Sequence, residues 1–276
     1  MTLNQLRLFQ VFKYALYAFL TLNVYLFFAE EFAASAVQFP DGVQLADIMV
    51  AYVATIDTAA WVVLLLMFEL ETYVLEDRHF TKPVTWTLQG LRLVCYAFIV
   101  SAFLDYVNSL TFVQSVAPLI GVTDLCALVS EQWSYAVDLD EYVGITAANC
   151  TSLSTATSFV QFSELQATVD IPGHEAITAL AWVDVINAAV WLVIVLVLEI
   201  DVRLQEKNRF EGVALRISTL SKYVLYSILV LALIYWALNG DFVDFWDALL
   251  WLLAFFFIEL NVVEWRNETQ ASGQNL

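Results

Sequence analysis

Residues 61–71 read WVVLLLMFELE: eight apolar residues come first, and two glutamates that flank one leucine follow them. The same pattern returns as WLVIVLVLEID at residues 191–201 and, less completely, as WLLAFFFIELN at residues 251–261. Apolar runs that end on charges are typical of membrane-spanning helices at the point where the chain leaves the hydrocarbon. The three copies therefore predict three related helices.

The composition indicates an integral membrane protein. Of the 276 residues, 61% are hydrophobic, and there are only 8 glycines and 4 prolines. A spanning helix needs about 20 mostly apolar residues, and six stretches meet that need: 8–29, 47–69, 86–110, 177–200, 214–238 and 242–262. A barrel would show strict alternation of apolar and polar residues instead. The sequence thus predicts an all-α protein with six transmembrane helices.

The six helices are predicted to form three repeated hairpins. A shift of 130 positions superposes residues 57–80 on 187–210 without a gap, and a shift of 190 adds the sixth helix. The first arms repeat too, as LRLFQVFKYALY at residues 6–17 and LRISTLSKYVLY at residues 215–226. Parallel repeats are related by an axis along the membrane normal, which predicts a pseudo-threefold bundle. The repeat also favours a retained first helix, although Arg7, Lys13 and the small residues 33–36 resemble a signal peptide.

The positions of the basic residues predict the orientation. All eleven lie near the N-terminus, the C-terminus, or the connections at about 70–92 and 200–222. Because lysine and arginine concentrate in cytoplasmic loops, both termini are expected in the cytoplasm, in a bacterial inner or plasma membrane. The predicted organisation is a bundle part over 1–110, an extracytoplasmic insert over 111–176, a second bundle part over 177–266 and a cytoplasmic tail over 267–276.

The insert between the third and fourth helices is acidic and contains no lysine or arginine. With a net charge of −18 for the chain, this disfavours nucleic acid and anionic lipid as outer partners. It leaves the lipid bilayer and a protein partner at the insert or at the cytoplasmic helix extensions; a halophile's solubility device is the alternative reading. Cys126 and Cys150 are the only cysteines of the insert, and on an oxidising face they are expected to form a disulfide.

Charged residues of both signs are expected at one depth near the cytoplasmic ends of the helices: Lys13, Arg92, Lys222, Glu69, Glu199 and Glu259. Pairs between these bases and these glutamates would lower the cost of holding charge near lipid. The alternative is an inner cation gate made by the three glutamates. Arg203 is placed four residues after Glu199 for a local pair, and Glu71 and Asp201 are expected to be solvated.

A second polar group is predicted near the middle of the membrane: Asp57, Asn187, Asp247, Asp184 and Asp244. Asp57 lies ten residues after Asp47 and twelve before Glu69, and a carboxylate at such depth costs about 2.5–3.5 kcal/mol. No basic residue is expected at that level, so these acids must be protonated, share protons or bind a cation. Oxygen ligands suit Na⁺, Ca²⁺, Mg²⁺ or H⁺, among which the sequence does not choose; a hydrogen-bonded clamp between helices is the structural alternative.

The expected function is that of a membrane transport-type protein with an intramembrane carboxylate site for a cation or proton. The alternative is a non-transporting scaffold or assembly subunit of a membrane complex. An enzyme is disfavoured, because the chain shows no nucleophile motif and no two-histidine metal spacing. Neither the ion nor the oligomeric state follows from the sequence.

Overall fold

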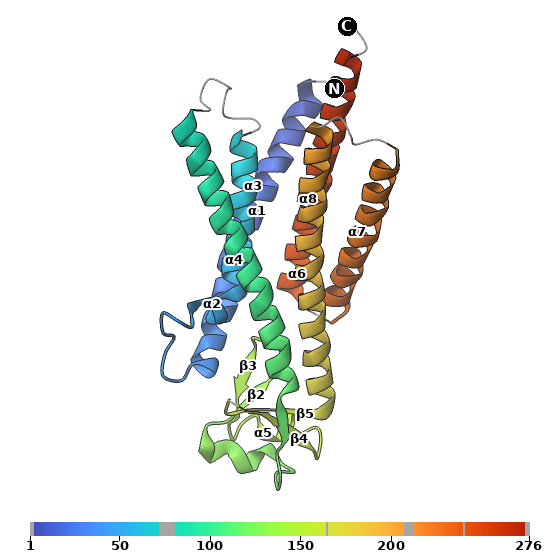
Figure 1. Cartoon of the computed structure of the whole chain (residues 1–276). Helices are drawn as coiled ribbons and strands as arrows, with labels where there is room; N and C mark the ends of the chain where they lie inside the picture. The colour runs from blue at the N-terminus through green and yellow to red at the C-terminus, as the bar shows by residue number, and fades with distance from the viewer. Residues whose placement is uncertain (1–2, 72–80, 164, 207–211, 240, 274–276) are drawn as a thin grey trace.

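Six long helices form a closed ring in the computed structural model, which describes residues 3–71, 81–163, 165–206, 212–239 and 241–273, and omits the side chains of 3–9, 202, 205–206 and 258–273. The helices are α1 (Leu3–Gln38), α3 (Val53–Glu69), α4 (Lys82–Gln114), α6 (Ile171–Glu206), α7 (Val213–Asn239) and α8 (Phe242–Gly273). Each packs against the next along the chain, and α8 returns to α1 (Figure 1). The N- and C-termini lie at one end of this bundle, here called the termini end.

Four helices in the described part of the chain are long and apolar enough to cross a membrane: Gln10–Gln38, Lys82–Gln114, Ile171–Asp201 and Val213–Asn239. Large apolar side chains such as Tyr25, Leu93 and Leu231 point outward from them and are each more than 60% exposed. This apolar exterior supports embedding in a membrane. Helix α3 has only 17 residues, and α8 lacks described side chains after Phe257, so six spans are not established.

The second predicted helix is broken. A short helix, α2 (Ile48–Ala51), precedes α3, and Tyr52 between them has φ −135° and ψ 41°. The backbone amides of Ala54 and Thr55 therefore lie at a helix start inside the bundle, where they need acceptors other than the preceding turn. Glu31 supplies these acceptors, as described below.

The prediction of an all-α protein is wrong for the insert, which folds around a five-stranded sheet at the end opposite the termini (Figure 1). The strands are β1 (Val116–Pro118), β2 (Ser134–Ala136), β3 (Tyr142–Gly144), β4 (Phe159–Phe162) and β5 (Ala167–Asp170), in the order β1-β4-β5-β2-β3. Neighbours are antiparallel except the parallel pair β2 and β5. The strands are short and rich in β-branched and aromatic residues, which favour sheet.

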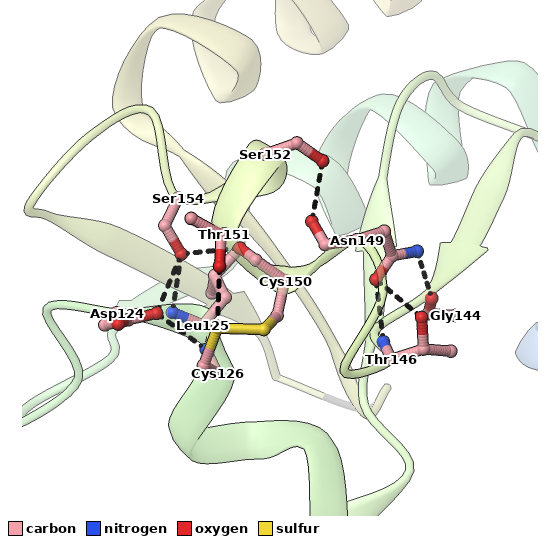
Figure 2. Close-up of a disulfide and its surroundings, with 10 residues drawn as sticks. All are labelled: Asp124, Leu125, Cys126, Gly144, Thr146, Asn149, Cys150, Thr151, Ser152 and Ser154. Carbon is pink, nitrogen blue, oxygen red and sulfur yellow. Dashed lines mark hydrogen bonds between the residues drawn. A yellow bond between two sulfur atoms is a disulfide. The ribbon is translucent and has the colours of Figure 1, made fainter.

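The predicted disulfide joins Cys126 to Cys150 (Figure 2). It connects the 3₁₀ helix η3 (Leu125–Glu131) to the short helix α5 (Cys150–Leu153). Beside it, the Asp124 carboxylate accepts hydrogen bonds from the Cys126 amide at 2.8 Å and the Ser154 hydroxyl at 3.1 Å. The two helices also share an apolar cluster that includes Leu125, Leu128 and Leu153, so the covalent link reinforces a packed contact.

The sheet is fixed directly to two helices of the bundle. Strand β1 follows α4 after one residue, and β5 continues into α6 without a loop. At that second junction the Gly173 amide donates to the Asp170 carboxylate at 2.7 Å, and the His174 ring donates to the Val113 carbonyl oxygen at 2.9 Å. The insert is therefore held over the end of the bundle rather than on a flexible tether.

Replacing Gly173 with alanine is expected to destabilise this junction by about 1–3 kcal/mol, the usual cost of an overpacked site. A Cβ there would lie 2.6 Å from Val169 Cγ2 and 2.8 Å from Asp170 Oδ1. Gly90→Ala in α4 is the matched control: its Cβ meets nothing within 4 Å, and it should be neutral or stabilise the helix. Thermal unfolding of both variants tests this; equal midpoints would contradict it.

Candidate functional site

A cavity of about 440 Å³ lies inside the ring of helices, between the sheet and the middle of the bundle. Its lining includes eight carboxyl groups: Glu31, Asp57, Asp105, Asp140, Asp184, Asp241, Asp244 and Asp247. No lysine, arginine or histidine is among the described residues that line it. This space, here called the acidic cavity, therefore collects negative charge from the helices and from the insert.

All five mid-membrane residues singled out in the sequence line this one cavity. Three of them, Asp57, Asn187 and Asp247, form its deep level, and a smaller pocket of about 40 Å³ continues below them. The buried Asn23 of α1 donates to Asp247 Oδ1 at 2.8 Å. By contrast, the buried Oδ1 of Asp57 has no hydrogen-bond partner among the described residues. At the deep level, the Asp247 carboxyl thus accepts a hydrogen bond from Asn23, whereas Oδ1 of Asp57 accepts none from the described residues.

A second level lies one turn closer to the sheet. Asp184 and Asp244 each precede a deep-level residue by three positions, which is about 4.5 Å along a helix. In the first repeat the corresponding residue is Ala54, which has no carboxyl. Glu31 of α1 supplies one there, because its Oε1 accepts from the Ala54 amide at 2.7 Å and its Oε2 from the Thr55 amide at 3.1 Å. Each repeat therefore has an acid at this level.

Four acids of the cavity were not predicted from the sequence: Glu31, Asp105, Asp140 and Asp241. Glu31 falls just beyond the first predicted span, in a segment expected to face outward, yet α1 continues to Gln38. Asp105 is the only acid in the third predicted span, and that isolation was the available signal. Asp140 and Asp241 belong to connections whose position over the bundle depends on the whole fold.

Four aromatic residues close the deep end of the cavity and are here called the aromatic plug: Trp61, Trp191, Trp251 and Phe255. The three tryptophans occupy the same position of the sequence repeat. The ring centroid of Trp61 lies 6.2 Å from that of Trp191 and 6.1 Å from that of Trp251, and Phe255 lies 4.6 Å from Trp191. The rings are at packing distances typical of aromatic clusters, and the plug lies between the acidic cavity and the termini end.

The turn between β2 and β3 covers the other end of the cavity. Its residues 137–141, here called the hairpin tip, place Leu139 and Asp140 in the cavity lining. Leu139 also packs against the buried cluster of α6, α7 and α8 that contains Leu180 and Trp236. The Tyr142 hydroxyl donates to the Leu139 carbonyl at 3.1 Å, which holds the turn in shape. Leu139 therefore packs against the helices at this end of the cavity.

The two acids of the hairpin tip bind protons more tightly than ordinary carboxyls. Burial, then the charges of Asp140, Asp241 and Glu141, raises the pKa of Asp138 to about 7. Burial, then the charge of Asp241, raises the pKa of Asp140 to about 6. The folded insert therefore holds protons that the unfolded chain would release at an ordinary aspartate pKa of 3.8.

The stability of the hairpin tip is expected to fall as the pH rises from about 4 to about 7, because over that range the unfolded state binds fewer protons. For each proton that the folded turn holds in excess of the unfolded chain, the equilibrium constant for opening of the turn rises about tenfold per pH unit. The rate of limited proteolysis of the insert is measured for the wild type and divided by the rate for Asp138→Asn/Asp140→Asn at the same pH. This ratio should rise across the range. A ratio that stays constant with pH would show that these carboxyls do not control the turn.

At the termini end, one of the expected charge pairs is present and two involve other acids. Lys13 donates to Glu69 at 2.5 Å. Two contacts differ from the prediction: Arg92 meets Glu71 at 2.7 Å, and Lys222 meets Asp201 at 3.1 Å. The predicted local pair of Glu199 with Arg203 of its own helix is confirmed, at 2.8 Å. The side chain of Glu259 lies outside the described residues.

The expectation that Asp201 is solvated is wrong, because this residue is 7% exposed and also accepts from the Ser218 hydroxyl at 2.6 Å. In the described residues, the three bases of the first arms are thus all bonded to acids of the neighbouring helices. For the described residues, the geometry is that of ties between neighbouring helices, and Glu69 and Glu199 are each paired with a base.

Comparison with protein-family models, with curated proteins and with solved structures finds no match to this chain.

Proposed function

We propose that this chain is a membrane transport-type protein whose acidic cavity binds a cation or exchanges protons. Six spanning helices arranged with pseudo-threefold symmetry would surround the cavity, and the acidic insert would cover its extracytoplasmic end. The observation that carries the proposal is the convergence of eight carboxyl groups on one cavity with no basic lining residue. So many like charges repel unless protons or cations neutralise them.

The two ends of the cavity support a transport role over a static clamp. A clamp needs acids that bond to neighbouring helices, as Asp247 does with Asn23, and it needs no open volume. Here the acids surround about 440 Å³ of space, bounded by the hairpin tip on one side and the aromatic plug on the other. Closures on both sides of a site are what alternating access requires.

The charge distribution supports the orientation. The termini end carries Lys13, Arg92 and Lys222, and lysine and arginine favour the cytoplasmic side. The cavity would then lie nearer the outer side, and a cation would enter past the hairpin tip. A bacterial inner or plasma membrane remains the proposed location.

The test is cation-dependent stabilisation of the purified protein in lipid nanodiscs. Wild-type protein should unfold at a higher temperature as the concentration of a bound cation rises, since a ligand that binds only the folded state stabilises it. Asp57→Asn/Asp247→Asn should lose this dependence, whereas Asp41→Asn, an exposed loop acid, should keep it. Equal dependence in all three proteins would favour the scaffold role, which needs no cation site.

A further inference from the structure

We propose that the acidic cavity accepts a linear aliphatic polyamine, a chain with two or more ammonium groups separated by methylene segments. This inference rests on the proposed function and names the class of cation that the cavity fits. It follows from the size of the cavity, the spacing of its acids and the apolar surface between them.

The cavity is too large for a site that grips a single bare ion. A water molecule occupies about 30 Å³ in the liquid, and small-molecule sites measure about 300–1,000 Å³; the acidic cavity, at about 440 Å³, lies in the second range. Among the described residues, no group of three or more acidic, histidine or cysteine side chains is arranged to hold a metal ion. The acids are therefore distributed around a volume and do not converge on one point.

The distribution has a regular spacing along the axis of the bundle. At the start of α8 an acid recurs at every third residue, from Asp241 just before the helix through Asp244 to Asp247 at the deep level. Each step corresponds to about 4.5 Å of helix. A ligand with one charge can neutralise only one of these levels at a time. A ligand whose charges are spaced along a chain can neutralise several, and each ammonium then has a carboxyl partner.

The wall of the cavity also contains apolar and aromatic residues. Ala54, Ala188 and Ala248 leave room beside the acids, and Phe27 and Ile99 add aliphatic and aromatic surface. Methylene segments of a polyamine would contact this surface and leave its water. Tyr106 and Trp236 also line the cavity, and the faces of aromatic rings attract cations.

Two carboxyl oxygens point to a missing hydrogen-bond donor. Asp57 Oδ1 and Asp105 Oδ2 are buried and have no partner among the described residues, and both residues line the cavity. They come from different helices, α3 and α4, and each lies beside the cavity without facing it, so a rotation of either carboxyl group about its terminal bond would present the unused oxygen to a donor in the cavity. Buried acceptors without partners are costly, and an ammonium group with three donor hydrogens satisfies them.

The test is isothermal titration calorimetry of the wild-type protein in nanodiscs at pH 8 with propylamine, putrescine and spermidine, which have one, two and three amino groups. The affinity should rise by at least about tenfold from the monoamine to the diamine, and by a similar factor to the triamine, because each further ammonium finds a further carboxyl level. Mg²⁺, Ca²⁺ and Na⁺ are titrated alongside. Physiological ionic strength, at which the Debye length is about 8 Å, suppresses attraction by the net charge of −18.

Asp244→Asn should weaken spermidine binding by about tenfold, because it removes the carboxyl that lies between Asp241 and Asp247, whereas Asp41→Asn, an exposed acid outside the cavity, should leave it unchanged. Similar affinities for the three amines would overturn the inference. If Na⁺, Mg²⁺ or Ca²⁺ binds in an Asp57- and Asp247-dependent way and the amines do not, the inference fails while the proposed function stands. If no cation binds, both fail.

Discussion

Replacement of Lys13 by methionine is expected to lower the free energy of unfolding by about 3–5 kcal/mol, the usual loss when one partner of a buried ion pair is removed. The Lys13 and Glu69 side chains are only 11% and 9% exposed. Glu69 also accepts from the Tyr17 hydroxyl at 3.2 Å, and this neutral donor would be left to stabilise a full carboxylate charge. Equilibrium unfolding in mixed micelles with increasing dodecyl sulfate measures the change.

Two further variants isolate the cause of that loss. Lys13→Met/Glu69→Met should recover most of the stability, because it removes both charges and leaves no buried ion without a partner. Arg203→Met is the matched control for an exposed pair: Arg203 and Glu199 are 70% and 51% exposed, and such pairs contribute about 0–1 kcal/mol. A double variant as unstable as Lys13→Met would show that packing, not charge, holds this contact.

Replacement of Trp61 by alanine should cost about 3–5 kcal/mol and also open the cavity toward the termini end. The stability loss follows from deleting a large side chain in a packed cluster, where its ring contacts Trp191, Trp251 and Phe255. The opening follows because the pocket of about 40 Å³ beside Trp61 would lose one wall. Proteoliposomes with this variant should leak a cation that wild-type liposomes retain.

The control for Trp61 is Trp86→Ala, at a tryptophan of α4 that is 74% exposed and lines neither the acidic cavity nor the smaller pocket. Its liposomes should remain as tight as those of the wild type. If Trp61→Ala liposomes are equally tight, the aromatic plug is only a packing cluster and the barrier of the bundle lies elsewhere.

The convergence of the mid-membrane acids followed from features that a sequence displays directly. A residue's depth in the membrane is inferred from its position within an apolar run. Its equivalent positions in the other repeats are inferred from the shift that aligns the repeats without a gap. Depth and register together placed Asp57, Asn187 and Asp247 at one level, and all three line both the large cavity and the small pocket below it.

The features missed from the sequence depend on side-chain reach or on contacts between distant segments. Arg92 and Lys222 bind Glu71 and Asp201, which occupy the same position of the sequence repeat. The expected partners lie about half a turn away, a difference smaller than the length of a lysine or arginine side chain. Glu31 caps a helix start that exists only because the chain breaks at Tyr52, and no periodicity signals that break.

The insert resisted prediction for a different reason. Its strands are three or four residues long, too short to show a clear alternation of apolar and polar positions. The parallel pairing of β2 with β5 joins segments about 30 residues apart, and the position of Leu139 over the bundle depends on that pairing. The disulfide was predictable there, because Cys126 and Cys150 are the only cysteines of the insert.

Charge movement across a supported membrane tests the central claim most directly. Proteoliposomes adsorbed on a sensor should give a transient current when a bound cation is added to wild-type protein, because the cation enters the acidic cavity within the membrane. Asp57→Asn/Asp247→Asn should give no current, and Asp41→Asn should match the wild type. Absence of any current from wild-type protein with protons, metal ions and amines alike, in samples shown to be folded, would contradict the account.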